Sequence, residues 1–170
     1  MTRSWYDHYA PGVPQSLDYE SLTLPQMLNR SAQDFASKEA LIFHDRPLSF
    51  HTLDEAVNRL ARALLSLGVK GGDRVALLLP NMPQIVIAAY AAWRIGAVVV
   101  MHNPLYSDRE LEYQLNDCGA SVLVALDLLC PRILALRERT ALKTLIVAHL
   151  GDHVSDPAEP LLHQEIEPAA

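Results

Sequence analysis

The sequence predicts an α/β fold in which an open, mostly parallel sheet is flanked by helices, with a small hairpin toward the N-terminus. From Arg74 onward, short continuous apolar runs alternate with helical patterns, and runs of this length are typical of strands buried on both faces. Four such runs with three helices between them imply parallel strands joined by right-handed crossovers. Half of the 170 residues are apolar, which is enough for one domain with a substantial core.

The region before the sheet begins with an arm and a helix. Residues 1–23 are rich in tyrosine and proline and are expected to form an irregular arm. A helix is expected over residues 24–35, with Thr23 as its N-cap. Its predicted inner face consists of Leu24, Met27, Leu28 and Ser31.

A hairpin and a second helix are expected next. Two short runs, at residues 40–43 and 47–50, predict antiparallel strands around a turn at residues 44–46. The pattern Thr52-x-x-Glu55 has the form of a capping box, which predicts the start of a helix at this point. A leucine-rich stripe follows, and Gly68 supplies the predicted C-terminal stop.

The α/β unit is expected to occupy residues 24–148. Within it, Ser107-x-x-Glu110 predicts a second capping box and Gly119 the end of that helix. The buried strands are expected at residues 75–79, 97–101, 122–125 and 144–148, and the remaining helices at residues 84–95 and 131–139. Residues 149–170 carry several prolines and acids and are expected to be a linker or the start of a further element.

Composition argues against several classes of protein. The formal net charge is −6 and there is no basic run, which argues against a nucleic-acid-binding surface. The apolar stretch at residues 85–101 is interrupted by Arg94 and Gly96 and is shorter than the roughly 20 residues of a membrane-spanning helix. We therefore expect a buried helix followed by a buried strand there, and membrane association that is peripheral at most. The N-terminus has no apolar leader pattern.

Motifs for phosphate, metal or nucleophile chemistry are missing. There is no GxxxxGK[ST] loop, and no GxGxxG follows a strand. Cys118 and Cys130 have no CxxC spacing, which favours a reducing cytoplasm, and Cys118 is expected to be a small core residue. His149 and His153 are four residues apart, but Gly151 lies between them, so we expect solvated loop residues and no metal site.

One loop is a candidate site because of its position. Ligands of open parallel sheets bind beyond the carboxyl ends of the strands, and Asn103-Pro104-Leu105-Tyr106 follows the second strand at that edge. Its backbone N–H groups and the helix that starts after Ser107 are placed to face an anionic ligand. The alternative is that Ser107, like Asn81 in the loop after the first strand, is an N-cap without a ligand.

Five segments occur in one order along the chain: VNRLA, LGVKGGDRVALLLPN, GAVVV, NPLY and LNDCGA. Together, across residues 48–127, they resemble the adenylate-forming superfamily and within it the long-chain fatty acyl-CoA ligases. The opening WYDHYAPGVP is similar to the N-terminal arm of the long-chain members. The resemblance covers almost the whole chain and implies the N-terminal subdomain of such an enzyme.

The resemblance implies a reaction and its limits. A fatty acid and ATP would give an acyl-adenylate and pyrophosphate, and CoA would then take the acyl group, with Mg²⁺ offsetting phosphate charge. The family's phosphate loop with its lysine, its later nucleotide-binding aspartate and its C-terminal catalytic lysine have no counterpart here. We therefore expect no catalytic residue in this segment and no adenylation by it alone.

Site detail from the resemblance is confined to one loop. It places residues 103–106 near the CoA entry side, although Met101-His102 departs from the apolar-small pair expected before that loop. Two other readings stay open: a non-catalytic interaction or dimerisation module, and an unrelated doubly wound domain that binds a small anion. Homodimerisation and the acyl chain length are not decided by the sequence.

Overall fold

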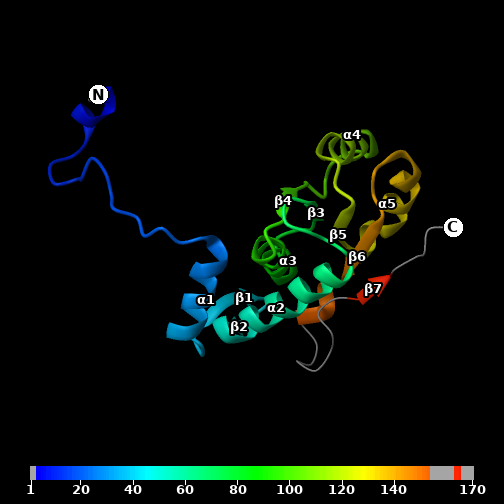
Figure 1. The fold of residues 1–170 in the computed structure, drawn as a ribbon, viewed down its shortest axis with the longest axis horizontal. Helices are drawn as coiled ribbons and strands as arrows, with labels where there is room; N and C mark the ends of the chain where they lie inside the picture. Colours follow the sequence, from blue (N-terminus) through cyan, green and yellow to red (C-terminus); the bar gives the residue numbers. More distant parts are fainter. Residues whose placement is uncertain (1–2, 154–162, 166–170) are drawn as a thin grey trace.

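A five-stranded sheet forms the centre of the computed structural model, which describes residues 3–153 and 163–165 (Figure 1). The strand order is β4-β3-β5-β6-β7, in which the first four strands are parallel and β7 is antiparallel to β6. The strands are β3 (Arg74–Leu78), β4 (Val98–Met101), β5 (Val122–Leu126), β6 (Thr144–Ala148) and β7 (His163–Glu165). The predicted mostly parallel sheet is confirmed, and β7 belongs to the stretch that was expected to be a linker or a further element.

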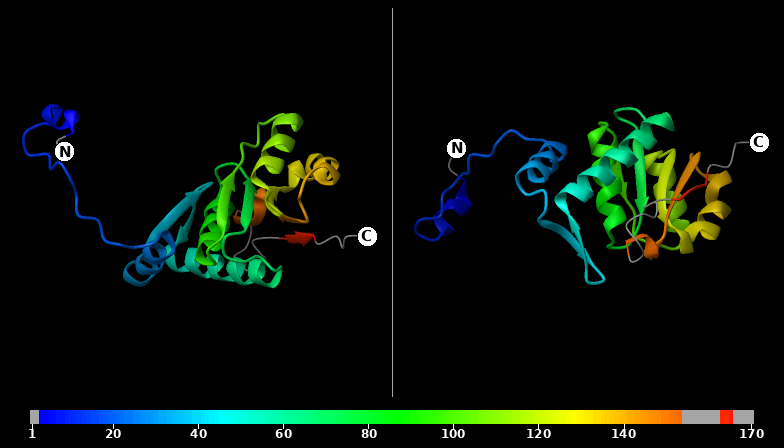
Figure 2. Two further views of the ribbon diagram at one scale, coloured as in Figure 1. Left: turned by 45° about the horizontal axis from the view of Figure 1, so that its top comes forward. Right: turned by 90° about the horizontal axis from the view of Figure 1, so that it is seen from below.

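Helices cover both faces of the sheet (Figures 1 and 2). One face packs against α2 (Phe50–Ser66) and α3 (Pro83–Arg94), and the other against α4 (Asp108–Cys118) and α5 (Cys130–Leu136). Along β3, Val75 and Leu77 point to the first face, and Ala76 and Leu78 to the second. This alternation, with all four side chains inaccessible to solvent, explains why the strand is a continuous apolar run.

Strand β4 is not buried as predicted. Val98 and Met101 are exposed, and Val99 and Val100 are partly buried. The reason is its position, because among the described residues β4 pairs only with β3 and lies at the edge of the sheet. An apolar run predicts a strand, but it does not predict which strand lies at the edge.

The chain before the sheet contains α1 (Leu24–Asp34) and a separate hairpin of β1 (Glu39–Phe43) and β2 (Arg46–Ser49). The described part of the arm, from residue 3 onward, includes a short 3₁₀ helix, η1 (Ser4–His8), and extends away from the rest of the chain (Figure 1). Thr23 caps α1 in a capping box with Gln26, as an N-cap was predicted there. The predicted inner face is wrong in part, because Leu28 is buried but Leu24 and Met27 are half exposed.

Helix α2 begins earlier than its sequence pattern indicated. Its N-cap is Ser49, whose Oγ accepts a hydrogen bond from the Thr52 amide at 3.1 Å. The prediction that Thr52 opens the helix is therefore wrong. The polar residue three positions earlier takes the capping role because β2 ends at Ser49 and Phe50 is already helical.

On the face of the sheet that α4 and α5 cover, the helix ends lie closer to the positions predicted from the sequence. Ser107 caps α4, and Gly119 ends it with a φ of 62°, in the left-handed region that favours glycine. The helix expected over residues 131–139 is divided into α5 and a short 3₁₀ turn, η3 (Arg137–Arg139). Residues 85–101 form most of α3 and then β4, and within the described ranges no helix has both the length and the apolar character to cross a membrane.

Candidate functional site

The carboxyl edge of the parallel strands is where this fold offers a site. β4 and β5 lie on opposite sides of β3, so the connections that follow β3 and β5 diverge to opposite faces of the sheet. Ligands of open α/β sheets bind at such a reversal of strand order. Four loops meet at this edge, at residues 79–82, 102–107, 127–129 and 149–152.

The predicted loop after β4 is held by local turns and by α5. Asn103 is exposed, and its Oδ1 accepts a hydrogen bond from the Leu105 amide at 3.0 Å. Pro104 is partly buried, whereas 89% of Leu105 is exposed. Tyr106 packs against the core between the sheet and α4–α5, and its carbonyl accepts a hydrogen bond from Arg132. The loop is therefore fixed in place with the Leu105 side chain in solvent.

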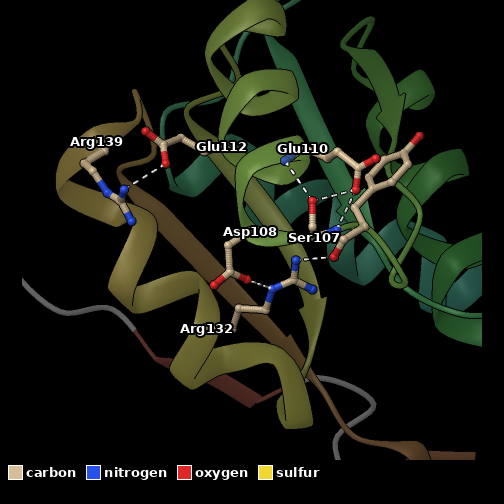
Figure 3. Close-up of polar contacts among 7 residues, drawn as sticks. Ser107, Asp108, Glu110, Glu112, Arg132 and Arg139 are labelled. Carbon is tan, nitrogen blue, oxygen red and sulfur yellow. Dashed lines mark hydrogen bonds and ion pairs between the residues drawn. The ribbon is translucent and has the colours of Figure 1, made fainter.

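The N-terminus of α4 is occupied by its own side chains (Figure 3). Ser107 Oγ accepts the Glu110 N–H at 3.4 Å, and the Glu110 carboxylate accepts both the N–H and the hydroxyl of Ser107 at 2.7 Å. These hydrogen bonds lower the pKa of Glu110 from its usual range. Asp108 adds a second carboxylate to the first turn, so an anionic ligand would meet negative charge here. The N-cap alternative describes Ser107 better than the anion-binding one.

The other proposed N-cap is wrong. Asn81 is exposed, and the N-cap of α3 is Met82, which makes no side-chain capping hydrogen bond. Pro83 at the first helical position explains why no cap is needed for one of the amides, because proline has no N–H.

Ion pairs fasten α4 to the elements beside it (Figure 3). Arg132 of α5 pairs with Asp108, and Arg139 of η3 pairs with Glu112 at 3.0 Å. The Arg139 carbonyl also accepts a hydrogen bond from Asn116 at 2.9 Å. These contacts orient the helix that follows the predicted loop.

His102 lies just before the predicted loop and is 4% exposed. Its amide bonds to the Leu77 carbonyl at 2.8 Å, and its Nδ1 is 3.2 Å from Gln114 Oε1. Because Gln114 presents an acceptor, Nδ1 carries the proton; Nε2 has no hydrogen-bond partner among the described residues. Burial lowers the pKa of His102, and the Gln114 hydrogen bond opposes this in part. Burial therefore favours the neutral form of the imidazole.

A polar network that the sequence did not predict joins the other loops. Gln84 Nε2, at the start of α3, donates to the His149 carbonyl at 2.9 Å and lies 3.4 Å from Asp152 Oδ2. Asp152 accepts the His149 amide at 2.9 Å, and the His149 ring lies 2.8 Å from Asp127. His149 is thus a loop residue whose side chain is 39% exposed, as expected, but it also takes part in a hydrogen-bond network that the sequence did not predict. Gln84 could have indicated this network from the sequence. It is an amide side chain in the first turn of a helix whose other residues are apolar or aromatic up to Arg94.

Two further features of the described residues bear on the chemistry of this edge. Among residues 3–153, no group of three His, Cys, Asp or Glu side chains is placed to hold a metal ion. Cys118 is only partly buried and donates to the Leu115 carbonyl at 3.5 Å, so its predicted core position is confirmed only in part. The described residues thus orient loops at the sheet edge.

Comparison with known proteins gives the family. A family model described as AMP-binding enzyme matches residues 28–169. This chain belongs to the AMP-binding enzyme family. Long-chain-fatty-acid–CoA ligases of Bacillus subtilis (strain 168) and Escherichia coli O6:H1 are 36% and 35% identical to it over 91% of the chain. The chain spans 28% of the length of these curated relatives.

Solved structures of the family have the same fold. A long-chain-fatty-acid-CoA ligase (FadD1) from Archaeoglobus fulgidus aligns with a TM-score of 0.74 and 31% identity, covering 84% of this chain and 30% of that one. The N-terminal domain of FACL13 from Mycobacterium tuberculosis aligns with a TM-score of 0.68 and 29% identity, covering 73% of this chain and 33% of that one. The resemblance predicted from the segments between residues 48 and 127 is confirmed.

Proposed function

We propose that this chain is the N-terminal part of an AMP-forming ligase that joins long-chain fatty acids to CoA. The observation that carries the proposal is the 36% identity to a long-chain-fatty-acid–CoA ligase over 91% of the chain. In the proposed reaction the fatty acid carboxylate attacks the α-phosphorus of ATP, which releases pyrophosphate and leaves acyl-AMP. The CoA thiol, after loss of its proton, then attacks the acyl carbon, AMP leaves and a thioester forms.

The residues described here do not fit a site for the ATP phosphates or for Mg²⁺. The N-terminus of α4 is capped by Ser107 and carries Asp108 and Glu110, and no metal-binding cluster is present among the described residues. In the proposed enzyme, those groups are held by the part of the protein outside this segment.

The loop Asn103–Tyr106 is proposed to line the CoA entry side. Its exposed side chain is apolar Leu105, and the adjacent turn carries carboxylates. This surface suits the uncharged pantetheine arm of CoA better than its phosphates, because like charges repel at short range. The buried network of Gln84 and Asp152 would keep the neighbouring loops rigid. A cytoplasmic location is proposed from the sparse cysteines.

The proposal is tested with the longer protein and with this 170-residue chain side by side. Each is incubated with palmitate, ATP, Mg²⁺ and CoA, and acyl-CoA, AMP and pyrophosphate are quantified. The longer protein should form all three in equal amounts, and the 170-residue chain should form none. Acetate and benzoate serve as short-chain and aromatic comparisons. Turnover of these two but not of palmitate would overturn the substrate class, and no turnover of any acid would overturn the ligase assignment.

A further inference from the structure

His102 is a buried polar residue whose hydrogen-bonding groups are satisfied only in part. It is 4% exposed, and its Nε2 has no partner among the described residues. A buried polar atom without a hydrogen bond lowers the stability of a folded chain, and an apolar side chain at this position would avoid that cost. Residues that break such a rule are concentrated at functional sites. The buried imidazole therefore indicates a role other than filling the core.

The other groups of His102 join two elements that border the loop Asn103–Tyr106. Its backbone N–H donates to the Leu77 carbonyl at 2.8 Å, which continues the pairing of β3 with β4 one residue past the end of β4. Its Nδ1 lies 3.2 Å from Oε1 of Gln114, near the middle of α4. His102 thus connects the sheet to α4 at the point where the loop begins.

The loop itself is closed by short-range hydrogen bonds. The Tyr106 N–H donates to the Asn103 carbonyl at 3.1 Å, and the Leu105 N–H donates to Asn103 Oδ1 at 3.0 Å. Because a turn closed in this way moves as one unit, the contacts at its two ends determine where it lies. Arg132 holds the far end through the Tyr106 carbonyl, and the His102 side chain holds the near end. The exposed side chain of Leu105 therefore lies where these two contacts place it.

We propose that His102, through its hydrogen bond to Gln114, is a positioning residue for CoA, because it fixes the loop Asn103–Tyr106 against which the pantetheine arm packs. This inference rests on the proposed function, in which that loop lines the CoA entry side. A displaced loop would weaken the binding of CoA, whose thiol has to be held close to the acyl carbon. Formation of the acyl-adenylate precedes the attack by CoA, so it should not depend on the loop.

The first test compares the unaltered longer protein with His102→Leu, which keeps a similar volume but cannot donate to Gln114. The KM for CoA should rise about 5-fold, which corresponds to the loss of one hydrogen bond. The fatty-acid-dependent exchange of pyrophosphate into ATP needs no CoA and should change by less than about 2-fold. The thermal midpoint should stay the same or rise, because the unpaired Nε2 is removed. An unchanged KM for CoA would overturn the proposal, as would a lower midpoint with all rates reduced together.

Two further variants test whether the hydrogen bond is the cause. His102→Asn places an amide nitrogen about where Nδ1 lies, so it should restore the KM for CoA. Gln114→Met removes the acceptor, so it should raise the KM as His102→Leu does and add nothing when the two are combined, as expected for partners in one bond. No rescue by His102→Asn, or a further rise in the double variant, would overturn the proposal. His51→Leu, at an exposed histidine of α2, is the matched control and should change none of these values.

Direct binding of CoA separates this inference from the proposed function. Equilibrium dialysis of CoA with the longer protein gives a Kd without turnover, and His102→Leu should raise this Kd about 5-fold as well. If the unaltered protein forms no acyl-CoA from any acid but shows this difference in Kd, only the proposed function is overturned. If acyl-CoA forms but the two proteins have the same Kd and KM for CoA, only the positioning role is overturned. No binding of CoA to the unaltered protein overturns both.

Discussion

The guanidinium of Arg94, at the end of α3, lies 2.7 Å from the carboxylate of Asp54 on α2. Asn58, one turn after Asp54, bonds to both: its Oδ1 accepts from Arg94 at 2.7 Å, and its Nδ2 donates to Asp54 at 3.0 Å. Both charged side chains are largely withdrawn from water, with exposures of 19% and 16%. This closed triad fixes α2 against α3 on one face of the sheet.

Removing the carboxylate of this triad should lower the free energy of unfolding more than removing a carboxylate from the surface. Asp54→Ala leaves Arg94 partly desolvated without its anion, so we expect a loss of about 2 kcal/mol in the free energy of unfolding. Glu20→Ala breaks the Arg30–Glu20 pair, whose side chains are mostly exposed, and should cost less than about 0.5 kcal/mol. Denaturant titration of both variants measures the difference, and equal losses would contradict a special role for the triad.

The capping box at Ser107 should stabilise α4 and set the charge of Glu110. Ser107→Ala removes both an acceptor for the Glu110 amide and a donor to its carboxylate, and loss of an N-cap costs about 1 kcal/mol. The pKa of Glu110 should rise toward its ordinary value, which an NMR titration of the carboxyl carbon would detect. Ser107→Thr keeps the hydroxyl and should leave both quantities nearly unchanged. An unaltered Glu110 titration in the alanine variant would exclude the hydrogen bond from the Ser107 hydroxyl as the cause.

The sequence predicted those parts of the fold that depend on neighbouring residues. Ser107 with Glu110 and the glycine at position 119 are local signals, and both act where the pattern placed them. The strands of the parallel sheet were found because burial on both faces leaves a continuous apolar run. The small shifts at strand and helix ends, such as the start of α2 at Phe50, reflect competition between two nearby polar residues for one cap.

The parts that depend on distant residues were missed. The exposure of Val98 and Met101 follows from the edge position of β4, which the order of strands decides and local composition does not. Likewise, Gln84 and Asp152 are 68 positions apart and meet only because α3 and the loop after β6 share one edge of the sheet. The candidate loop at residues 103–106 was located from its place after a strand; its contacts with CoA remain a proposal.

The hairpin turn offers a stabilising substitution. Asp45 has a φ of 59°, where glycine has no steric cost, so Asp45→Gly should raise the free energy of unfolding by about 0.5–1 kcal/mol. Asp73→Gly is the matched control with the opposite sign, because Asp73 Oδ2 accepts the Lys70 amide at 2.8 Å and that contact would be lost. Thermal unfolding of the two variants and of the unaltered chain measures whether the two stability changes have opposite signs. A destabilising Asp45→Gly would contradict a type I′ turn at His44 and Asp45, which both have positive φ.

The buried His102 should make stability depend on pH. Burial lowers its pKa in the folded chain, so below the unfolded value, near 6.5, the unfolded chain binds more protons than the folded one. The stability contribution is therefore complete above about pH 7 and falls as the pH drops below 6.5, by at most about 1.4 kcal/mol per pH unit. Denaturant unfolding from pH 7.5 to 5.0 should show this loss, and His102→Gln, which takes up no proton, should show a shallower one. If the slope of His102→Gln equals that of the unaltered chain, another group is responsible for the pH dependence.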